Sequence, residues 1–331
     1  MSKIFVTGGA GYVGSVLVPQ LLNEGHHVTV YDMFYFKDYL KEHNNLDKII
    51  GDIRDHELIG RSLDNHNIFI NLACISNDAS FELNENLSTS INLDAFEPMV
   101  KIAKEKKIQK FIYASSSSVY GVSNEKNVKE DHPLVPLTLY NKFKGMCEPI
   151  LLKYADKNFC PVIFRPATVC GFSPRMRLDL TVNILTNHAY HNDKIRVFGG
   201  KQLRPNIHIQ DYCDFVKLLI ESDNHKIFKQ IFNVGSENMS VLEIAKTVKK
   251  IVESFKNNQN KIEISIEDSN DNRSYHINSE KAFEILGFKT RYKIEDAVID
   301  ICNSFKENKI SNSFDEINYF NVQTLKSLNI K

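Results

Sequence analysis

Lys3-Ile4-Phe5-Val6-Thr7-Gly8-Gly9-Ala10-Gly11-Tyr12-Val13-Gly14 opens the chain and decides its fold. The apolar run predicts a strand, the glycines predict a tight turn, and apolar residues at helical spacing from Val16 to Leu22 predict a helix. Glycines at 8, 11 and 14 let the backbone approach a pyrophosphate and let the helix lie close to the strand. Free amides at the helix start would face the phosphates. The stretch therefore predicts a dinucleotide-binding turn.

A carboxylate follows at the end of the second predicted strand. His27-Val28-Thr29-Val30-Tyr31-Asp32 is that strand, and no arginine comes directly after it. Asp32 can accept both hydroxyls of an adenosine ribose and would repel a 2′-phosphate. The pattern therefore favours NAD over NADP as cofactor.

Strands and helices continue to alternate along the first half of the chain. Further strands are expected at 49–53, 68–73, 110–114 and 161–166, with helices at 87–106 and around Tyr140. Prolines 19 and 149 should bend or interrupt their helices. The alternation predicts an α/β fold, a doubly wound parallel (Rossmann) sheet with a smaller, interleaved C-terminal domain. We place the cofactor domain at 1–166 and 207–235, and the substrate domain with its tail at 167–206 and 236–331.

The second half has fewer clear patterns. Ser173 to Leu180 introduces a helix that continues through His188, a short strand follows at 195–200, and another strand is expected at 231–235. Asp211 is the expected N-cap of a helix at 212–220. Helices are expected at 240–255 and 279–286, and Ser313 to Glu316 has the capping-box pattern before an apolar tail.

Tyr140 and Lys144 are the expected proton-transfer pair. They stand four residues apart, so on a helix they share one face. A cationic neighbour lowers the pKa of a phenol, whose ordinary value is about 10, so Lys144 together with a positively charged nicotinamide would make Tyr140 a better base. The run Ser115-Ser116-Ser117-Ser118, at the end of the 110–114 strand, offers a hydroxyl beside it. An ordinary amphipathic pair is the alternative interpretation.

Composition excludes several classes of partner. The 331 residues carry 41 basic and 41 acidic side chains, so no overall field favours nucleic acid or an anionic membrane. The six cysteines are scattered without metal-ligand spacing, which predicts no metal site and reduced, buried thiols. The N-terminal apolar run is too short for a signal peptide, and no segment has the length to span a membrane. We expect a cytoplasmic protein.

Taken together, these motifs resemble the extended short-chain dehydrogenase/reductase family, specifically its NAD-dependent nucleotide-sugar epimerases, dehydratases and dehydrogenases. The resemblance covers nearly the whole chain, through Thr7 to Gly14, Asp32, Gly51-Asp52-Ile53, Leu72-Ala73, Ser115 to Gly121, Tyr140 to Lys144, and Arg204-Pro205-Asn206-Ile207-His208-Ile209. It implies that Ser116, Tyr140 and Lys144 are catalytic. It also implies cofactor contacts from Gly8, Gly11, Tyr12, Val13, Gly14, Asp32, Asp52, Ile53, Leu72, Ala73, Tyr140 and Lys144, with Asn92 helping to position the lysine.

The resemblance also implies a nucleoside-diphosphate sugar as substrate. Arg204 and Arg273 match positions that bind the pyrophosphate, and Thr168 stands where galactose epimerases carry a substrate-binding asparagine. Arg175 and Arg177 are further candidates, because their stretch resembles a subgroup from bacterial surface-sugar pathways that includes heptose-modifying dehydrogenases. Relatives dimerise through helices near 87–106 and 138–156, so a homodimer or larger assembly is expected.

One departure from the family pattern bears on the reaction. Dehydratases carry Asp-Glu directly after the catalytic Ser or Thr, whereas this chain has Ser117 and Ser118. A 4,6-dehydratase is therefore not expected. A C4 epimerase is the main hypothesis, and the sequence alone does not separate it from a dehydrogenase. The alternatives are a 4-dehydrogenase or keto-sugar reductase, with a GDP-heptose among its candidate substrates, and a non-catalytic NAD-sensing binding protein.

Overall fold

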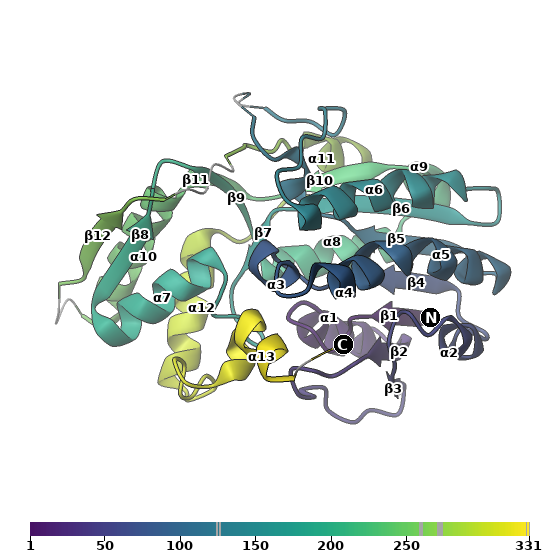
Figure 1. Ribbon diagram of the computed structural model, residues 1–331, viewed down its shortest axis with the longest axis horizontal. Helices are drawn as coiled ribbons and strands as arrows, with labels where there is room; N and C mark the ends of the chain where they lie inside the picture. Colours follow the sequence, from purple (N-terminus) through teal and green to yellow (C-terminus); the bar gives the residue numbers. More distant parts are fainter. Residues whose placement is uncertain (124, 126, 258–260, 270–273, 329, 331) are drawn as a thin grey trace.

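The computed structural model describes residues 1–331 except 124, 126, 258–260, 270–273, 329 and 331. Its main element is a sheet of seven parallel strands in the order β10-β6-β5-β4-β1-β2-β3 (Figure 1). The strands are β1 (Lys3–Thr7), β2 (His27–Asp32), β3 (Leu46–Ile50), β4 (Ile68–Asn71), β5 (Lys110–Ala114), β6 (Cys160–Pro166) and β10 (Ile231–Val234). The predicted doubly wound α/β sheet is confirmed.

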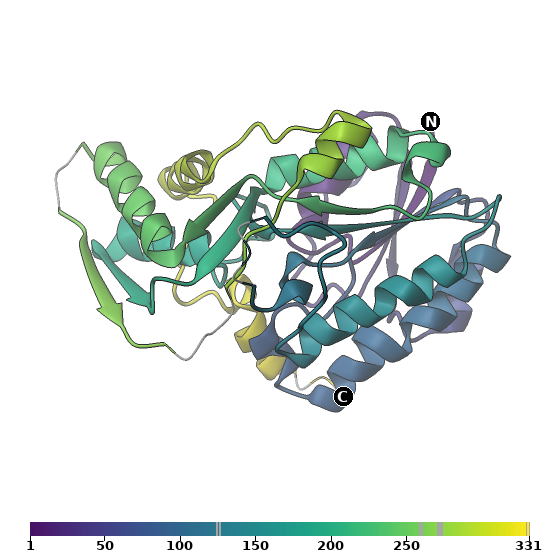
Figure 2. The ribbon, with the colours of Figure 1, turned by 90° about the horizontal axis from the view of Figure 1, so that it is seen from above.

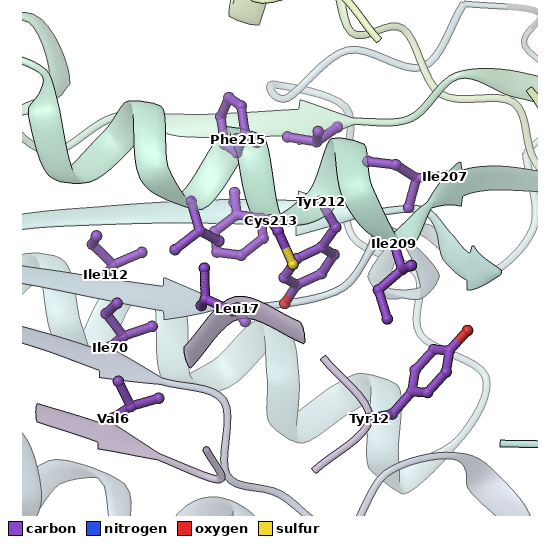
Figure 3. Close-up of a cluster of buried hydrophobic side chains, with 14 of the residues drawn as sticks. Val6, Tyr12, Leu17, Ile70, Ile112, Ile207, Ile209, Tyr212, Cys213 and Phe215 are labelled. Atoms are coloured by element: carbon purple, nitrogen blue, oxygen red, sulfur yellow. The ribbon is translucent and has the colours of Figure 1, made fainter. Parts of the chain in front are cut away.

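The sheet is buried on both faces, which explains its continuous apolar strands. In β1, Ile4 and Val6 face a cluster that includes α1 (Gly14–Asn23) and α8 (Ile209–Glu221), as Figure 3 shows for part of it. Phe5 faces the opposite cluster with α2 (His56–Ser62), α5 (Phe96–Glu105) and α6 (Leu139–Lys153). There Phe69 and Phe111 of neighbouring strands stack with ring centroids 4.6 Å apart. Helices therefore cover both sides of the sheet (Figure 2).

The expected helix at 87–106 is not continuous. It consists of α4 (Glu85–Thr89), a π-helical turn η1 (Ser90–Asp94) and α5. In the π turn the amide of Ala95 donates to the carbonyl of Ser90. Pro98 has no N–H for the carbonyl of Asp94 and its ring crowds that carbonyl, which favours a wider turn.

Other sequence expectations also need correction. Strand β3 ends at Ile50, so Gly51, Asp52 and Ile53 follow the strand. Pro149 does not interrupt α6. Asp211 is not the N-cap of α8, because its carboxylate accepts hydrogen bonds from the amides of Arg291 and Tyr292, while the His208 side chain caps the helix.

Smaller sheets and helices form a second region, here called the small-sheet lobe. Its three-stranded sheet has the order β11-β9-β7, and a parallel pair joins β12 to β8. The strands are β7 (Thr168–Cys170), β8 (Lys194–Phe198), β9 (Leu203–His208), β11 (Glu237–Ser240) and β12 (Glu263–Glu267). Its main helices are α7 (Thr181–Asn192), α10 (Val241–Phe255) and α12 (Ile294–Lys306). The strand at 195–200 and the helix at 240–255 were expected, whereas β7, β9, β11, β12 and α12 were not.

Short elements connect these parts. They are α3 (Asp78–Phe81), η2 (Ser117–Tyr120), α9 (Asn224–Ile227), α11 (Glu280–Leu286), η3 (Ile317–Tyr319) and α13 (Asn321–Leu328). The capping box expected at Ser313 is absent, since Glu316 caps η3 instead. Within the described residues, no helix has the length and apolar character needed to cross a membrane.

Gly14, the first residue of α1, makes the closest approach in the glycine turn. A Cβ placed on Gly14 would lie 2.2 Å from the carbonyl oxygen of Gly9, which is backbone and has little freedom to move. A Cβ on Gly60, within α2, would meet nothing closer than 3.6 Å, at Ile102. The two helical glycines therefore differ in what a methyl group would do.

We predict opposite effects for the two alanine substitutions. Gly14→Ala should lower the free energy of unfolding by about 1–3 kcal/mol through overpacking. Gly60→Ala should raise it by up to about 1 kcal/mol, because glycine is a poor helix former. Denaturant unfolding followed by circular dichroism measures both, and an unchanged midpoint for Gly14→Ala would contradict the close-packing argument.

Candidate active site

A cavity of about 460 Å³ lies at the carboxyl ends of the parallel strands, bordered also by the small-sheet lobe. Nearly all the predicted site residues line it: Gly8, Gly11, Tyr12, Val13, Gly14, Asp32, Asp52, Ile53, Leu72, Ala73, Ser116, Tyr140, Lys144, Thr168, Arg175, Arg177 and Arg204. Asn92 lies behind the lining, and Arg273 is outside the described residues. The fold thus brings the cofactor and substrate candidates to one place.

The turn after β1 fits a dinucleotide. Gly8 has φ +74°, and a Cβ there would lie 2.6 Å from the backbone nitrogen of Ala73. Asp32, at the end of β2, is held by the amides of Ala10 (3.0 Å) and Phe34 (2.9 Å). Burial raises the pKa of the Asp32 carboxyl, and these amide bonds oppose the rise. The carboxylate is thus held rigidly where an adenosine ribose is expected.

Tyr12 connects the glycine turn to the small-sheet lobe. Its hydroxyl donates to the carbonyl of Gly171 (2.6 Å) and accepts from the Asn183 side chain (3.0 Å). The Ser173 hydroxyl donates to the carbonyl of Tyr12 (2.7 Å). Sequence reasoning gave Tyr12 only as a cofactor contact and missed this link, because its partners lie more than 150 residues away in the chain.

Asp52 has a cationic partner that the sequence analysis also missed. Arg54 donates to both carboxylate oxygens, with Nη2 2.6 Å from Oδ2 and Nε 3.0 Å from Oδ1. Burial raises the pKa of Asp52, but the bonds from Arg54 outweigh it, so the net shift is downward. The signal in the sequence was the basic side chain of Arg54, two residues after Asp52.

The serine run divides its hydroxyls between two networks. Ser116 and Ser118 are joined at 2.7 Å, and Ser118 donates to the side chain of Asn141, next to Tyr140 (2.6 Å). Ser115 instead donates to Glu148 (2.6 Å), which forms a buried ion pair with Arg165 at 2.6 Å. All four serines line the cavity, and the Ser116–Ser118 pair is linked through Asn141 to the helix that carries Tyr140.

Lys144 approaches the sheet edge as expected, but the Tyr140 pKa differs from the expectation. The lysine Nζ donates to the carbonyl of Ala114 (2.8 Å). Burial raises the pKa of Tyr140 well above its ordinary value, nearby Cys74 and Asp78 add to the rise, and the Arg177 charge opposes it. Burial therefore dominates the Tyr140 pKa in the protein without bound nucleotide, and the direction is opposite to the expected lowering.

The Asn92 side chain bonds the backbone of Ile75, which lines the cavity. Its side chain accepts from the amide of Ile75 (2.8 Å) and donates to the carbonyl of the same residue (2.9 Å). Ile75 lines the cavity, whereas Asn92 makes no hydrogen bond to Lys144 in the described part of the chain. In this structure it holds the loop after β4.

The arginines of the 173–180 stretch are both buried but differ in pairing. Arg177 forms an ion pair with Asp179 (2.8 Å) and donates to Ser76. Arg175 donates to Asn321, and its Nε and Nη1 atoms have no hydrogen-bond partner among the described residues. Arg204 in β9 and Thr168 in β7 line the same cavity.

Comparison with known proteins identifies the class of this site. The model of the NAD dependent epimerase/dehydratase family matches residues 4–235. The chain therefore belongs to the NAD-dependent epimerase/dehydratase family, whose members are nucleotide-sugar-modifying enzymes with NAD as cofactor.

Proteins similar to this chain include a decarboxylase and a 4-epimerase, so they do not share one reaction. The low-salt glycan biosynthesis protein Agl12 of Haloferax volcanii is 26% identical, covering 89% of this chain and 96% of the relative. A UDP-N-acetyl-alpha-D-glucosaminuronate decarboxylase of Bacillus cytotoxicus is 29% identical over 76% of this chain and 81% of its own. The structure of UDP-glucuronic acid 4-epimerase from Bacillus cereus, with UDP-glucuronic acid and NAD, has a TM-score of 0.82 at 26% identity, covering 92% and 99%.

We predict that the buried Arg165–Glu148 pair holds β6, α6 and Ser115 in place. Both residues are at most 3% exposed. Glu148→Ala should lower the free energy of unfolding by about 3–5 kcal/mol, because it leaves the guanidinium charge buried and unpaired. Glu263→Ala, which removes an exposed pair with Lys194, should change it by less than about 1 kcal/mol. Equal effects of the two substitutions in chemical denaturation would contradict this role.

Proposed function

We propose that this enzyme is an NDP-sugar 4-epimerase: it oxidises the C4 hydroxyl of a nucleotide-diphosphate sugar and reduces the resulting ketone from the opposite face. The observation that carries the proposal is the meeting of Ser116, Tyr140 and Lys144 with the glycine turn at one cavity. A hydroxyl, a phenol and an ammonium group beside a dinucleotide turn are the groups that hydride abstraction from an alcohol requires.

In this proposal Tyr140 accepts the proton of the C4 hydroxyl while Ser116 holds its oxygen. Bound NAD supplies the hydride acceptor. Because burial raises the Tyr140 pKa, the phenol is protonated in the protein alone, and its action as a base needs nearby positive charge. Arg177 already opposes that rise, and Lys144 lines the same cavity.

The residues after Ser116 argue against a dehydratase. Removal of water needs a general acid and a general base. The hydroxyls of Ser117 and Ser118, at the ordinary pKa of serine, can act as neither. Both hydroxyls are also engaged, since Ser117 contacts the Tyr275 hydroxyl at 3.5 Å and Ser118 donates to Asn141. These residues therefore favour oxidation of a sugar hydroxyl without loss of water over dehydration.

The test is product analysis with a panel of sugar nucleotides. Purified enzyme is incubated with NAD and UDP-, dTDP- and GDP-linked hexoses, UDP-glucuronic acid and a GDP-heptose. We expect one C4 epimer and no net NADH. A keto product formed together with an equal amount of NADH would show that the enzyme is a dehydrogenase and not an epimerase. If no sugar were converted, neither assignment would hold.

Tyr140→Phe is the matched chemical test. Without the phenolic oxygen, kcat should fall by about 100- to 10,000-fold, the range that general acid–base groups contribute. Binding of NAD, measured by calorimetry, should persist. Tyr154→Phe, at the end of α6, removes a hydroxyl that bonds Glu97 and should leave turnover unchanged. Retained activity in Tyr140→Phe would exclude this residue as the base.

We also propose a homodimer formed by α5 and α6. The two helices lie side by side on one outer face (Figure 2), and Met146 of α6 is 40% exposed. Sedimentation at micromolar concentration should show a dimer, and Met146→Arg should weaken it through burial of a charge. A monomer for the unaltered chain would refute this assembly.

A further inference from the structure

The C-terminal tail, residues 313–328, forms part of the cavity wall. Glu316 pairs with Lys37 in the segment after β2 (3.3 Å), and the Asn321 side chain donates to Ser76 after β4 (2.9 Å). The amide of Asn321 donates to Asp179 in the segment before α7 (3.1 Å). Asn321 and Leu325 line the cavity, and Figure 1 shows α13 between the small-sheet lobe and the large sheet. The tail therefore joins both parts at the site.

Arg175 faces this wall with an incomplete set of partners. It is 2% exposed, and its Nη2 donates to Oδ1 of Asn321 at 2.5 Å. Its Nε and Nη1 atoms have no hydrogen-bond partner in the described part of the chain. Donors of a buried charged group that stay unsatisfied are costly, so a ligand is expected to complete them.

No neighbouring carboxylate neutralises Arg175. The described residues include no ion pair to it, and Asp179 is already bound by Arg177 and by the amide of Asn321. Burial lowers the pKa of Arg175 to about 9, and the Arg177 charge adds to this; Asp179, Tyr39 and Asp32 act in the opposite direction. The site therefore holds a positive charge that an anion would stabilise.

The surroundings of Arg175 belong to the cofactor side of the cavity. Its guanidinium carbon lies 3.7 Å from the ring centroid of Phe36, in the segment after β2. The charge of Asp32, the expected partner of the adenosine ribose, acts on Arg175. In a dinucleotide the diphosphate is adjacent to that ribose, and a planar guanidinium can offer it two parallel donors.

We propose that Arg175 binds the diphosphate of the dinucleotide and that Asn321 of the tail positions it, which makes the tail part of the cofactor site. This concerns cofactor binding alone and does not depend on which sugar the enzyme converts. Arg175 is thus assigned to NAD and not to the sugar nucleotide, for which the family resemblance made it a candidate.

The test measures dissociation constants of NAD, ADP-ribose and adenosine by calorimetry on protein freed of bound nucleotide. Arg175→Gln removes the charge. Asn321→Asp keeps an oxygen acceptor for Arg175 and adds a negative charge that neutralises the guanidinium. Both should weaken NAD and ADP-ribose by about 10- to 100-fold and leave adenosine unchanged, because adenosine has no phosphate. Arg196→Gln, an exposed arginine in β8, and Lys326→Gln, an exposed lysine in α13, are the controls and should bind like the unaltered chain.

Stability separates ligand binding from a structural role. Arg175→Gln removes a buried charge without an ion-pair partner, so the nucleotide-free protein should unfold at an unchanged or higher temperature, while the gain in Tm from added NAD should shrink. Unchanged affinity for NAD would overturn the proposal, including the case in which KM for the sugar nucleotide rises instead. Equal loss of adenosine binding would also overturn it.

Discussion

The shared direction of the seven strands is the constraint on which the site depends. Since all run parallel, the segments after β1, β2, β4, β5 and β6 emerge at one edge. That edge receives the glycine turn, Asp32, the serine run and the loop leading to Thr168. Residues distant in the chain thereby meet at one edge, and the sheet that carries them is buried on both faces.

Sequence reasoning located what local pattern determines. The glycine spacing, Asp32 at a strand end and the four-residue separation of Tyr140 and Lys144 need only strand and helix geometry, and the structure brings all of them to one cavity. It failed where a distant partner decides the conformation. Aspartate is a common N-cap residue, but the carboxylate of Asp211 accepts hydrogen bonds from the amides of Arg291 and Tyr292 instead. The helix at 87–106 is a failure of another kind, since it was expected to be continuous because its apolar spacing hid the local effect of Pro98.

The sequence also could not predict the electrostatic environment of the site residues. A tyrosine beside a lysine suggested a lowered pKa, yet burial is a property of the packed molecule and reverses the sign. Likewise Arg175 and Arg177 look equivalent in the sequence, and only the packed structure shows that Arg177 has Asp179 while Arg175 faces the tail. Burial and pairing, not residue type, distinguish them.

The bonds of Tyr12 bear on how the molecule can open. A hinge motion that swung the small-sheet lobe away from the sheet would have to break the hydrogen bonds to Gly171 and Asn183, each worth about 1 kcal/mol. Those bonds originate in the glycine turn, so such a swing would distort the turn in which a dinucleotide is expected to lie. Opening between the small-sheet lobe and the sheet would therefore change the shape of the glycine turn. A substrate that entered without such opening would leave the turn as it is.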